Sequence, residues 1–145
     1  MLTELWFEGS RDEKKHFGDD CTMRKSETLS LVCKWLDGYF AGLPPDWLPP
    51  MRLDGATPFR RAVSDEMRRI PFGKTVTYGD IAKSLAARFG KSKMSAQAVG
   101  GAIGWNPICI IIPCHRVIGV GGKLIGYGGG MRNKIALLKH EGVEP

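Results

Sequence analysis

The order of hydrophobic and polar positions at the start of the chain is first strand-like and then helical. Residues 2–7 alternate in part and are aromatic, which predicts a β-strand that ends before Gly9. Apolar residues then recur at helical spacing over residues 29–40, with Ser26 as the N-cap and Gly42 closing the pattern. This region is therefore predicted to combine a strand with one helix.

A proline-rich connection separates this region from the rest of the chain. Residues 42–50 contain two Pro-Pro pairs, and such a composition makes a connection semi-rigid. We place a domain boundary near residue 55. The chain then divides into a small N-terminal α/β domain of residues 1–55 and a second domain of residues 56–145.

Helical patterns dominate the second region. Helices are expected at residues 58–70, 78–89, 95–103 and 131–140. Thr57 and Pro58 give the first of them an N-cap followed by proline at the first helical position. The next two are short and joined by a tight polar turn, which is typical of a helix-turn-helix. The predicted fold class is α+β, with a mainly helical, winged-helix-like second domain.

Two segments of the second region are not predicted to be helical. Residues 108–112 are a run of apolar residues between Pro107 and Pro113, too short for most helices, which predicts a buried extended segment. It leads directly into Cys114. Residues 119–130 are rich in glycine, so the backbone there can turn sharply or approach a ligand closely.

The charge of the chain is divided unevenly between the two regions. The formal net charge is +6, made up of −3 in residues 1–55 and +9 in residues 56–145. A concentrated positive charge is typical of a region that binds a polyanion such as nucleic acid. The sequence has no apolar window long enough to span a membrane and no signal-peptide pattern at its start, so we expect a soluble, cytoplasmic protein without a membrane partner.

The four cysteines form no CxxC pair and are interpreted as separate thiols. Cys114 is followed by His115 and Arg116, and a nearby base or positive charge is what generates a nucleophilic thiolate. The residues alone leave two alternatives open, a reactive thiol or a buried structural cysteine beside a surface His-Arg pair. Cys109 is expected to be a core thiol, and because His16 and the other cysteines lack zinc-site spacing, no metal is expected.

Six motifs make the chain resemble the O6-alkylguanine-DNA alkyltransferases, also called methylated-DNA-protein-cysteine methyltransferases. They occur in order through the whole second region, and the Pro-Cys-His-Arg core is the most specific of them. The motifs lie at residues 72–78, 98–102, 106–107, 112–117, 126–130 and 137–142. The first region matches more loosely, at residues 5–9 and 39–42.

The resemblance implies single-turnover DNA repair. Cys114 would accept a methyl or other alkyl group from O6 of a guanine flipped out of double-stranded DNA, with O4-alkylthymine as a second substrate. His115 would activate the thiol through a water, and Glu141 would orient the imidazole. Asn106 would brace the active-site turn. Tyr78 would donate a proton or a hydrogen bond to the departing O6.

The glycine-rich stretch would then form the pocket for the flipped base. Backbone groups of Val117, Tyr127, Gly128 and Gly129 would contact the base, because glycine lets the main chain come close. The resemblance requires no metal and no cofactor, since the protein's own thiol takes the alkyl group. It also implies a monomer.

The helix expected at residues 95–103 would enter the minor groove of the duplex. Its DNA-binding residues would be Gln97, Ala98, Gly100 and Gly101. Arg116, Lys91 and Lys93 would either contact phosphates or serve local structure, and the two lysines could equally form a solvated charged face. Many relatives have an arginine at the position of Gln97, where it fills the gap that the flipped base leaves. Glutamine fills space without bringing charge, so we expect base flipping to be retained and affinity for DNA to be reduced.

Three other function classes remain as alternatives. A non-catalytic alkyltransferase-like protein would bind the damaged base without accepting its alkyl group, and Cys114 argues against this. A helix-turn-helix regulator would need base-reading side chains that the 95–103 helix lacks. A Cys-His hydrolase would turn over a substrate other than DNA. Because relatives usually begin with an additional hairpin, we also expect the first domain to lack its first hairpin.

Overall fold

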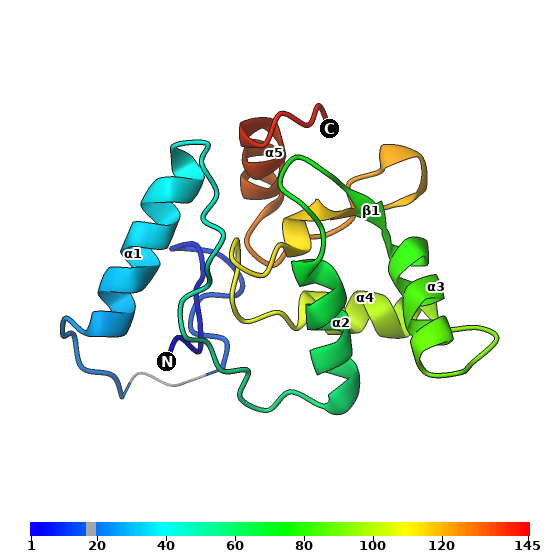
Figure 1. Ribbon diagram of the computed structural model, residues 1–145, viewed down its shortest axis with the longest axis horizontal. Helices are drawn as coiled ribbons and strands as arrows, with labels where there is room; N and C mark the ends of the chain where they lie inside the picture. Colours follow the sequence, from blue (N-terminus) through cyan, green and yellow to red (C-terminus); the bar gives the residue numbers. More distant parts are fainter. Residues whose placement is uncertain (17–19) are drawn as a thin grey trace.

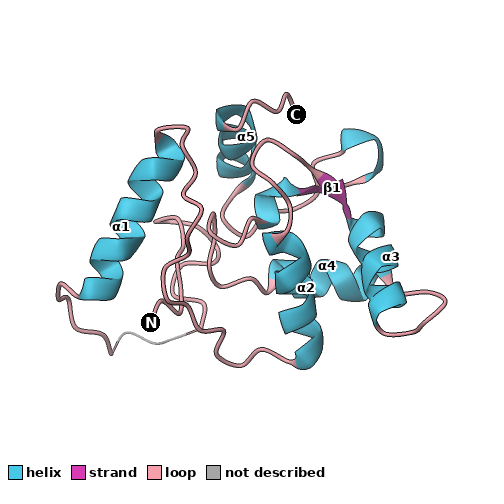
Figure 2. Ribbon diagram, viewed as in Figure 1, coloured by secondary structure: helices cyan, strands magenta, loops and turns pink. Residues whose placement is uncertain are grey.

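The fold mixes helices with a small sheet, as Figures 1 and 2 show for the computed structural model, which describes residues 1–16 and 20–145. The helices are α1 (Glu27–Phe40), α2 (Pro58–Arg68), α3 (Tyr78–Arg88), α4 (Ala96–Gly104) and α5 (Met131–His140), with the 3₁₀ helices η1 (Cys114–Arg116) and η2 (Val120–Gly122). Strands β1 (Val76–Thr77) and β2 (Val117–Ile118) pair in parallel. The α+β class and all of the expected helices are confirmed. In the described ranges, no helix is both long and apolar enough to cross a membrane.

Side-chain caps begin the helices where the sequence predicts them. Ser26, Thr57 and Ser95 each accept a hydrogen bond from a backbone N–H three residues further on. Thr77 forms a capping box with Asp80, in which each side chain accepts from the other residue's backbone N–H. A cap of this kind contributes about 1 kcal/mol. The capping box fixes the start of α3 at Tyr78.

The strand predicted for residues 2–7 is wrong. The chain pairs there, within the described residues, through isolated parallel bridges that join Leu2 to Met51 and Leu5 to Ile108. Each bridging partner directly follows a proline, Pro50 or Pro107, whose carbonyl accepts one backbone hydrogen bond. Since proline has no N–H, neither bridge can be extended into a ladder on that side.

The segment 108–112 is buried as expected, but it is not extended. It forms a tight turn in which the N–H of Ile112 donates to the carbonyl of Ile108 over 3.2 Å, and Ile110 takes a left-handed φ of 69°. The side chain of Asn106 bonds to both ends of this turn. Because the Asn106 amide and a single bridge to Leu5 supply partners for its backbone groups, the apolar run can be buried without joining a sheet.

One hydrophobic core includes side chains from both regions of the chain. Val32, Trp35 and Tyr39 of α1 belong to the same cluster as buried residues of α2, α3, α4 and the 108–112 turn. In Figure 1, α1 and α3 lie at opposite ends of the molecule, and the chain around Cys114 passes between them. The division of the chain at residue 55 stays a prediction.

Candidate active site

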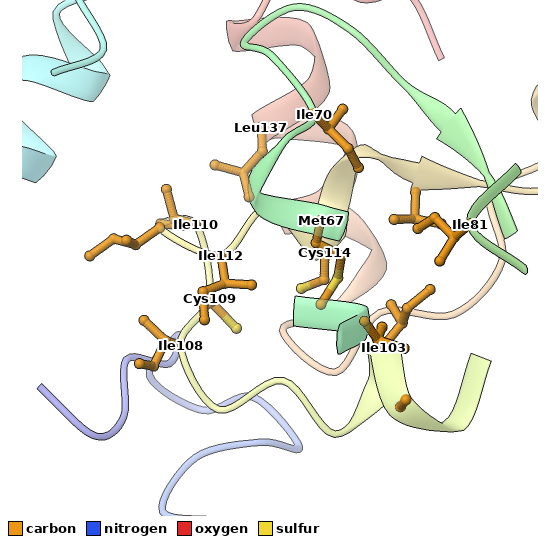
Figure 3. Packing of buried hydrophobic residues seen from close by; sticks show 14 of the residues in the cluster. Met67, Ile70, Ile81, Ile103, Ile108, Cys109, Ile110, Ile112, Cys114 and Leu137 are labelled. Atoms are coloured by element: carbon orange, nitrogen blue, oxygen red, sulfur yellow. The ribbon is translucent and has the colours of Figure 1, made fainter. Parts of the chain in front are cut away.

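Cys114 borders a cavity of about 590 Å³, a size typical of small-molecule pockets. It begins η1 and is 7% exposed. Figure 3 shows it among core side chains such as Met67 and Ile112, so the thiol lies between the core and the cavity. The other lining residues are Arg11, Asp12, Tyr78, Gly79, Ala96, Gly100, Ile103, Gly104, Asn106, Gly119, Val120, Ile125, Gly126, Tyr127 and Gly128.

Asn106 holds the turn that carries Cys114. Its Nδ2 donates to the carbonyl of Ile112 over 2.9 Å and to Sγ of Cys114 over 3.1 Å, while its Oδ1 accepts from the N–H of Ile108. The amide is buried, so these bonds are shielded from water. Asn106 therefore both shapes the turn and points a donor at the sulfur.

The surroundings of Cys114 favour its thiolate. Hydrogen bonds from the Cys109 thiol and the Asn106 amide, together with the positive charge of Lys134, lower the pKa of Cys114 although burial opposes them. The same contact with Cys114, and burial, raise the pKa of Cys109, which keeps its proton. Lys134 is fully buried, and its Nζ donates to the carbonyl of Val117 over 2.8 Å. The buried cation and the two donors all act on the Cys114 sulfur.

His115 follows the thiol and is fully buried. Its Nε2 lies 2.7 Å from Oε1 of Glu141, and its Nδ1 has no hydrogen-bond partner within residues 1–16 and 20–145. Burial lowers the pKa of His115, and this outweighs the opposite effect of Glu141, so the imidazole is neutral at neutral pH. A neutral ring that donates through Nε2 has Nδ1 as its proton acceptor.

Glu141 is the hub of a buried network of polar groups. Its carboxylate bonds to His115, to the hydroxyl of Tyr39 over 2.7 Å and to the N–H of Gly73 over 3.1 Å, and it receives Nε and Nη2 of Arg116. Burial by itself would raise the pKa of Glu141, but the hydrogen bonds from His115 and Arg116 lower it to about 2. Glu141 is therefore a buried anion that is hydrogen-bonded to His115.

Of the two roles expected for Arg116, the structure contradicts the phosphate contact and supports the role in local structure. The residue is 7% exposed, and its guanidinium is held by Glu141 and, through Nη1, by the carbonyl of Ile70 at 2.7 Å. A guanidinium enclosed in this way compensates the buried carboxylate and cannot reach a phosphate outside the protein. Arg116 therefore supports the site by compensating the charge of Glu141.

Tyr78 is brought to the cavity by the start of α3. Its hydroxyl donates to the carbonyl of Ile125 over 3.2 Å. Burial, followed by the negative charge of Cys114, raises the pKa of Tyr78, so the phenol remains protonated at neutral pH. Tyr78 is thus a protonated phenol that lines the same cavity as Cys114.

The expected base-pocket residues are only partly brought together. Tyr127 and Gly128 line the cavity, but Val117 and Gly129 are not among its lining residues. The carbonyl of Val117 accepts from Lys134, and Gly129 packs so tightly on Phe7 and Tyr127 that a Cβ there would collide with both rings. Ile125 and Val120, which the sequence did not single out, contribute to the wall instead.

Helix α4 presents an open face of small residues. Gln97, Ala98 and Gly101 are exposed, and Gly100 lines the cavity. A Cβ added at Gly100 or Gly101 would meet no described atom within 4 Å, so the glycines leave the surface beside the cavity free. A surface of this kind admits close approach by a large ligand.

Lys134, Cys109 and Asp12 also contribute to the site and were missed from the sequence. Lys134 had a usable signal, because with Leu137, Leu138 and Glu141 it shares one face of α5 at helical spacing, which predicts that it points inward. The hydrogen bond from Cys109 to Cys114 and the position of Asp12 in the cavity wall had no comparable signal in the sequence. Both depend on segments that only the fold brings together.

The chain is similar in sequence to proteins of one kind. A family model described as "6-O-methylguanine DNA methyltransferase, DNA binding domain" matches residues 58–143. A "Methylated-DNA--protein-cysteine methyltransferase" of Mycobacterium leprae is 46% identical over 106 residues, which make up 73% of this chain and 61% of that protein. The protein of the same name from Methanosarcina acetivorans is 41% identical over 132 residues, 91% of this chain and 81% of that one. The chain thus spans 61% of the Mycobacterium leprae relative's length.

The fold is similar to a solved structure as well. A crystal structure described as Mycobacterium tuberculosis OGT in complex with DNA superimposes with a TM-score of 0.69 at 44% sequence identity. The match covers 80% of this chain and 69% of that chain. The resemblance therefore extends from the motifs to the three-dimensional arrangement.

Proposed function

This chain belongs to the 6-O-methylguanine DNA methyltransferase family, and we propose that it repairs DNA by transferring an alkyl group from O6 of guanine to Sγ of Cys114. The observation that carries the proposal is a nucleophile and a proton donor on one cavity wall. Cys114 has a lowered pKa, and Tyr78, in the same cavity, keeps its proton. Because the thiol of Cys114 can accept the alkyl group, the site argues against a non-catalytic protein that only binds the alkylated base.

The transfer is a displacement at the alkyl carbon. The bond from Sγ of Cys114 to that carbon forms as the bond from the carbon to O6 breaks, and the electron pair of the broken bond stays on O6. Tyr78 donates its proton or a hydrogen bond to this oxygen. The proton of the thiol passes through a water to the free Nδ1 of His115, which Glu141 orients. The thioether is permanent, so one molecule repairs one base.

The duplex would reach the cavity along α4. Gln97, Ala98, Gly100 and Gly101 form the face that we assign to the minor groove of double-stranded DNA, and the flipped base would enter between Tyr78 and Gly128. The net charge of +9 on residues 56–145 supports binding of a polyanion. We propose that α3 and α4 act as a helix-turn-helix in a winged-helix-like domain, and that the protein acts as a monomer.

Mass spectrometry tests the proposal. The protein is incubated with duplex DNA that contains O6-methylguanine, and intact and peptide masses are followed. We expect one methyl group on the peptide that contains Cys114, no gain in Cys114→Ala, and a normal gain in the matched control Cys33→Ala, an exposed thiol on α1. Turnover beyond one equivalent, or no methyl gain by the folded protein, would refute the function.

A further inference from the structure

Two cysteines lie together at the active site, and the reaction described above uses the sulfur of only one of them as an acceptor. Cys114 begins η1 and borders the cavity. Cys109 lies in the turn before it, is 3% exposed and is not among the residues that line the cavity. The chain therefore holds a second thiol behind the proposed nucleophile, among the core side chains.

A single side chain fixes the turn that carries both thiols. Nδ2 of Asn106 donates to the carbonyls of Ile108 and Ile112, over 3.3 Å and 2.9 Å. The same nitrogen donates to Sγ of Cys114 over 3.1 Å. Because one buried amide holds both ends of the turn, Cys109 at its start and Cys114 just after its end are kept close to each other.

The two thiols are in direct contact. The thiol of Cys109 donates a hydrogen bond to Sγ of Cys114, and Figure 3 shows both side chains in the same buried cluster. This hydrogen bond, burial and the negative charge of Cys114 raise the pKa of Cys109. The first and the last of these causes require the Cys114 thiolate. The proton of Cys109 is therefore held less tightly once the sulfur of Cys114 has lost its negative charge.

We propose that this pair is a site of oxidative modification, in which a small hydroperoxide oxidises Cys114 and Cys109 then closes a disulfide with it. Cys114 meets the oxidant first, because it borders the cavity and Cys109 lies behind it. Thiols that react with peroxides are typically accessible thiolates beside a second cysteine, and Cys114 has both properties. The effect on repair rests on the proposed function, whereas the disulfide itself does not.

The modification proceeds in two balanced steps. Sγ of Cys114 first attacks one oxygen of the peroxide, the O–O bond breaks, and the departing hydroxide takes up the proton that the Cys114 thiol had lost. This gives a sulfenic acid and water. Sγ of Cys109 then attacks the sulfur of Cys114, the S–O bond breaks, and the hydroxide leaves as water with the proton of the Cys109 thiol. The thiols are oxidised to a disulfide, and the peroxide is reduced to water.

The disulfide protects an acceptor that can be used only once. A sulfenic acid without a partner thiol is oxidised further to a sulfinic acid, which thiol reductants do not reverse. A disulfide is reduced by thiol exchange, which returns Cys114 to the form that can take an alkyl group. The pair therefore withholds repair under oxidising conditions and restores it when thiol reductants are present.

Peptide masses of the oxidised protein test the pair. The protein is treated with hydrogen peroxide, its remaining thiols are blocked with iodoacetamide in denaturant, and trypsin releases residues 94–116, which contain Cys109 and Cys114 and no other cysteine. In the wild type we expect this peptide to lose the two thiol hydrogens and to carry no iodoacetamide adduct. Cys33→Ser, at an exposed thiol on α1, should give the same result.

The critical variant is Cys109→Ser, because its hydroxyl can still donate to Cys114 but cannot form a disulfide. We expect its Cys114 to be converted to the sulfinic acid by the same treatment. Methyl transfer from a duplex with O6-methylguanine is then measured before and after addition of dithiothreitol. The oxidised wild type should regain most of its capacity to accept a methyl group, and oxidised Cys109→Ser should regain almost none.

The outcomes separate this inference from the proposed function. A wild type in which Cys114 stays a free thiol, or is oxidised without a bond to Cys109, overturns the inference. A disulfide from Cys114 to Cys21 or Cys33 overturns it as well, and so does a Cys109→Ser variant that recovers as fully as the wild type. A reduced wild type that takes no methyl group refutes the proposed function instead, and the peptide masses still decide the inference.

Discussion

At the scale of single residues, the site depends on buried charges that compensate one another. Glu141 is balanced by Arg116 and bonded to His115, while Lys134 adds positive charge near the Cys114 sulfur. Removing one partner of such a network leaves another charge buried without compensation. This lowers the free energy of unfolding by about 3–5 kcal/mol. The chemistry of Cys114 and the stability of the protein are therefore linked through the same side chains.

The pH dependence of stability tests this link. The pKa of Glu141 is about 2 in the folded protein against an ordinary 4.5, so its stabilising effect is complete above pH 4.5 and is lost as the pH falls toward 2. We expect Glu141→Gln to lower the free energy of unfolding at pH 7 by about 3–5 kcal/mol. Between pH 4.5 and pH 2, the free energy of unfolding of this variant should fall less than that of the wild type. Urea unfolding across this range checks both effects. Glu144→Gln, an exposed carboxylate, should change neither.

A second prediction concerns the thiol next to the nucleophile. Replacing Cys109 by alanine removes the hydrogen bond that contributes most to the lowered pKa of Cys114. We expect that pKa to rise in Cys109→Ala, so that alkylation of the Cys114 peptide by iodoacetamide requires a higher pH than in the wild type. Peptide mass spectrometry over a pH series gives the pH at which the rate of alkylation of the Cys114 peptide is half-maximal. Cys33→Ala serves as the control, and an unshifted midpoint in Cys109→Ala would exclude the assigned role.

At the scale of elements, helix starts and turns position the reactive groups. The capping box at Thr77 fixes Tyr78 as the first residue of α3, and Asn106 closes the turn that leads to Cys114. The caps were predictable, because they depend on residues three apart in the sequence. The turn at 108–112 was not, because its backbone bonds to the Asn106 side chain, to Leu5 and, from Ile112, to the carbonyl four residues earlier, instead of to a continuous strand.

The exposed face of α4 gives the prediction at this scale. Gln97→Ala shortens the one long polar side chain that we assign to the gap left by the flipped base. We expect binding to a duplex with O6-methylguanine to weaken, while the reaction with free O6-alkylguanine base proceeds at the wild-type rate. Fluorescence anisotropy and single-turnover kinetics provide the two measurements. Thr22→Ala, outside α3 and α4, is the control, and equal losses in both assays would contradict the gap-filling role.

At the scale of the whole molecule, one core joins the first region to the second. Trp35 on α1 is 5% exposed, and its Nε1 donates to the carbonyl of Trp47 over 2.9 Å. Tyr39 on the same helix bonds to Glu141 across 102 residues of sequence. The active site is therefore supported from both sides of the boundary that the sequence places near residue 55.

Unfolding experiments test whether the two regions are independent. We expect Trp35→Ala to destabilise the chain by about 3–5 kcal/mol and to leave a single cooperative transition, in which helix content and protection of Cys114 are lost together. Circular dichroism and thiol labelling in urea follow the two signals. Leu43→Ala, at an exposed position, should have little effect. Two separate transitions would instead support the predicted division into domains.

The sequence by itself determined the features that depend on neighbours along the chain. Helical spacing and N-caps placed the helices, and the motif around Cys114 indicated the proposed nucleophile, because these signals act within about one helical turn. The tertiary structure alone decided which groups surround that nucleophile. The buried position of Arg116, the donation by Cys109 and the entry of Asp12 into the cavity join segments far apart in sequence. A buried charge must find its partner in space, and local pattern carries no record of that partner.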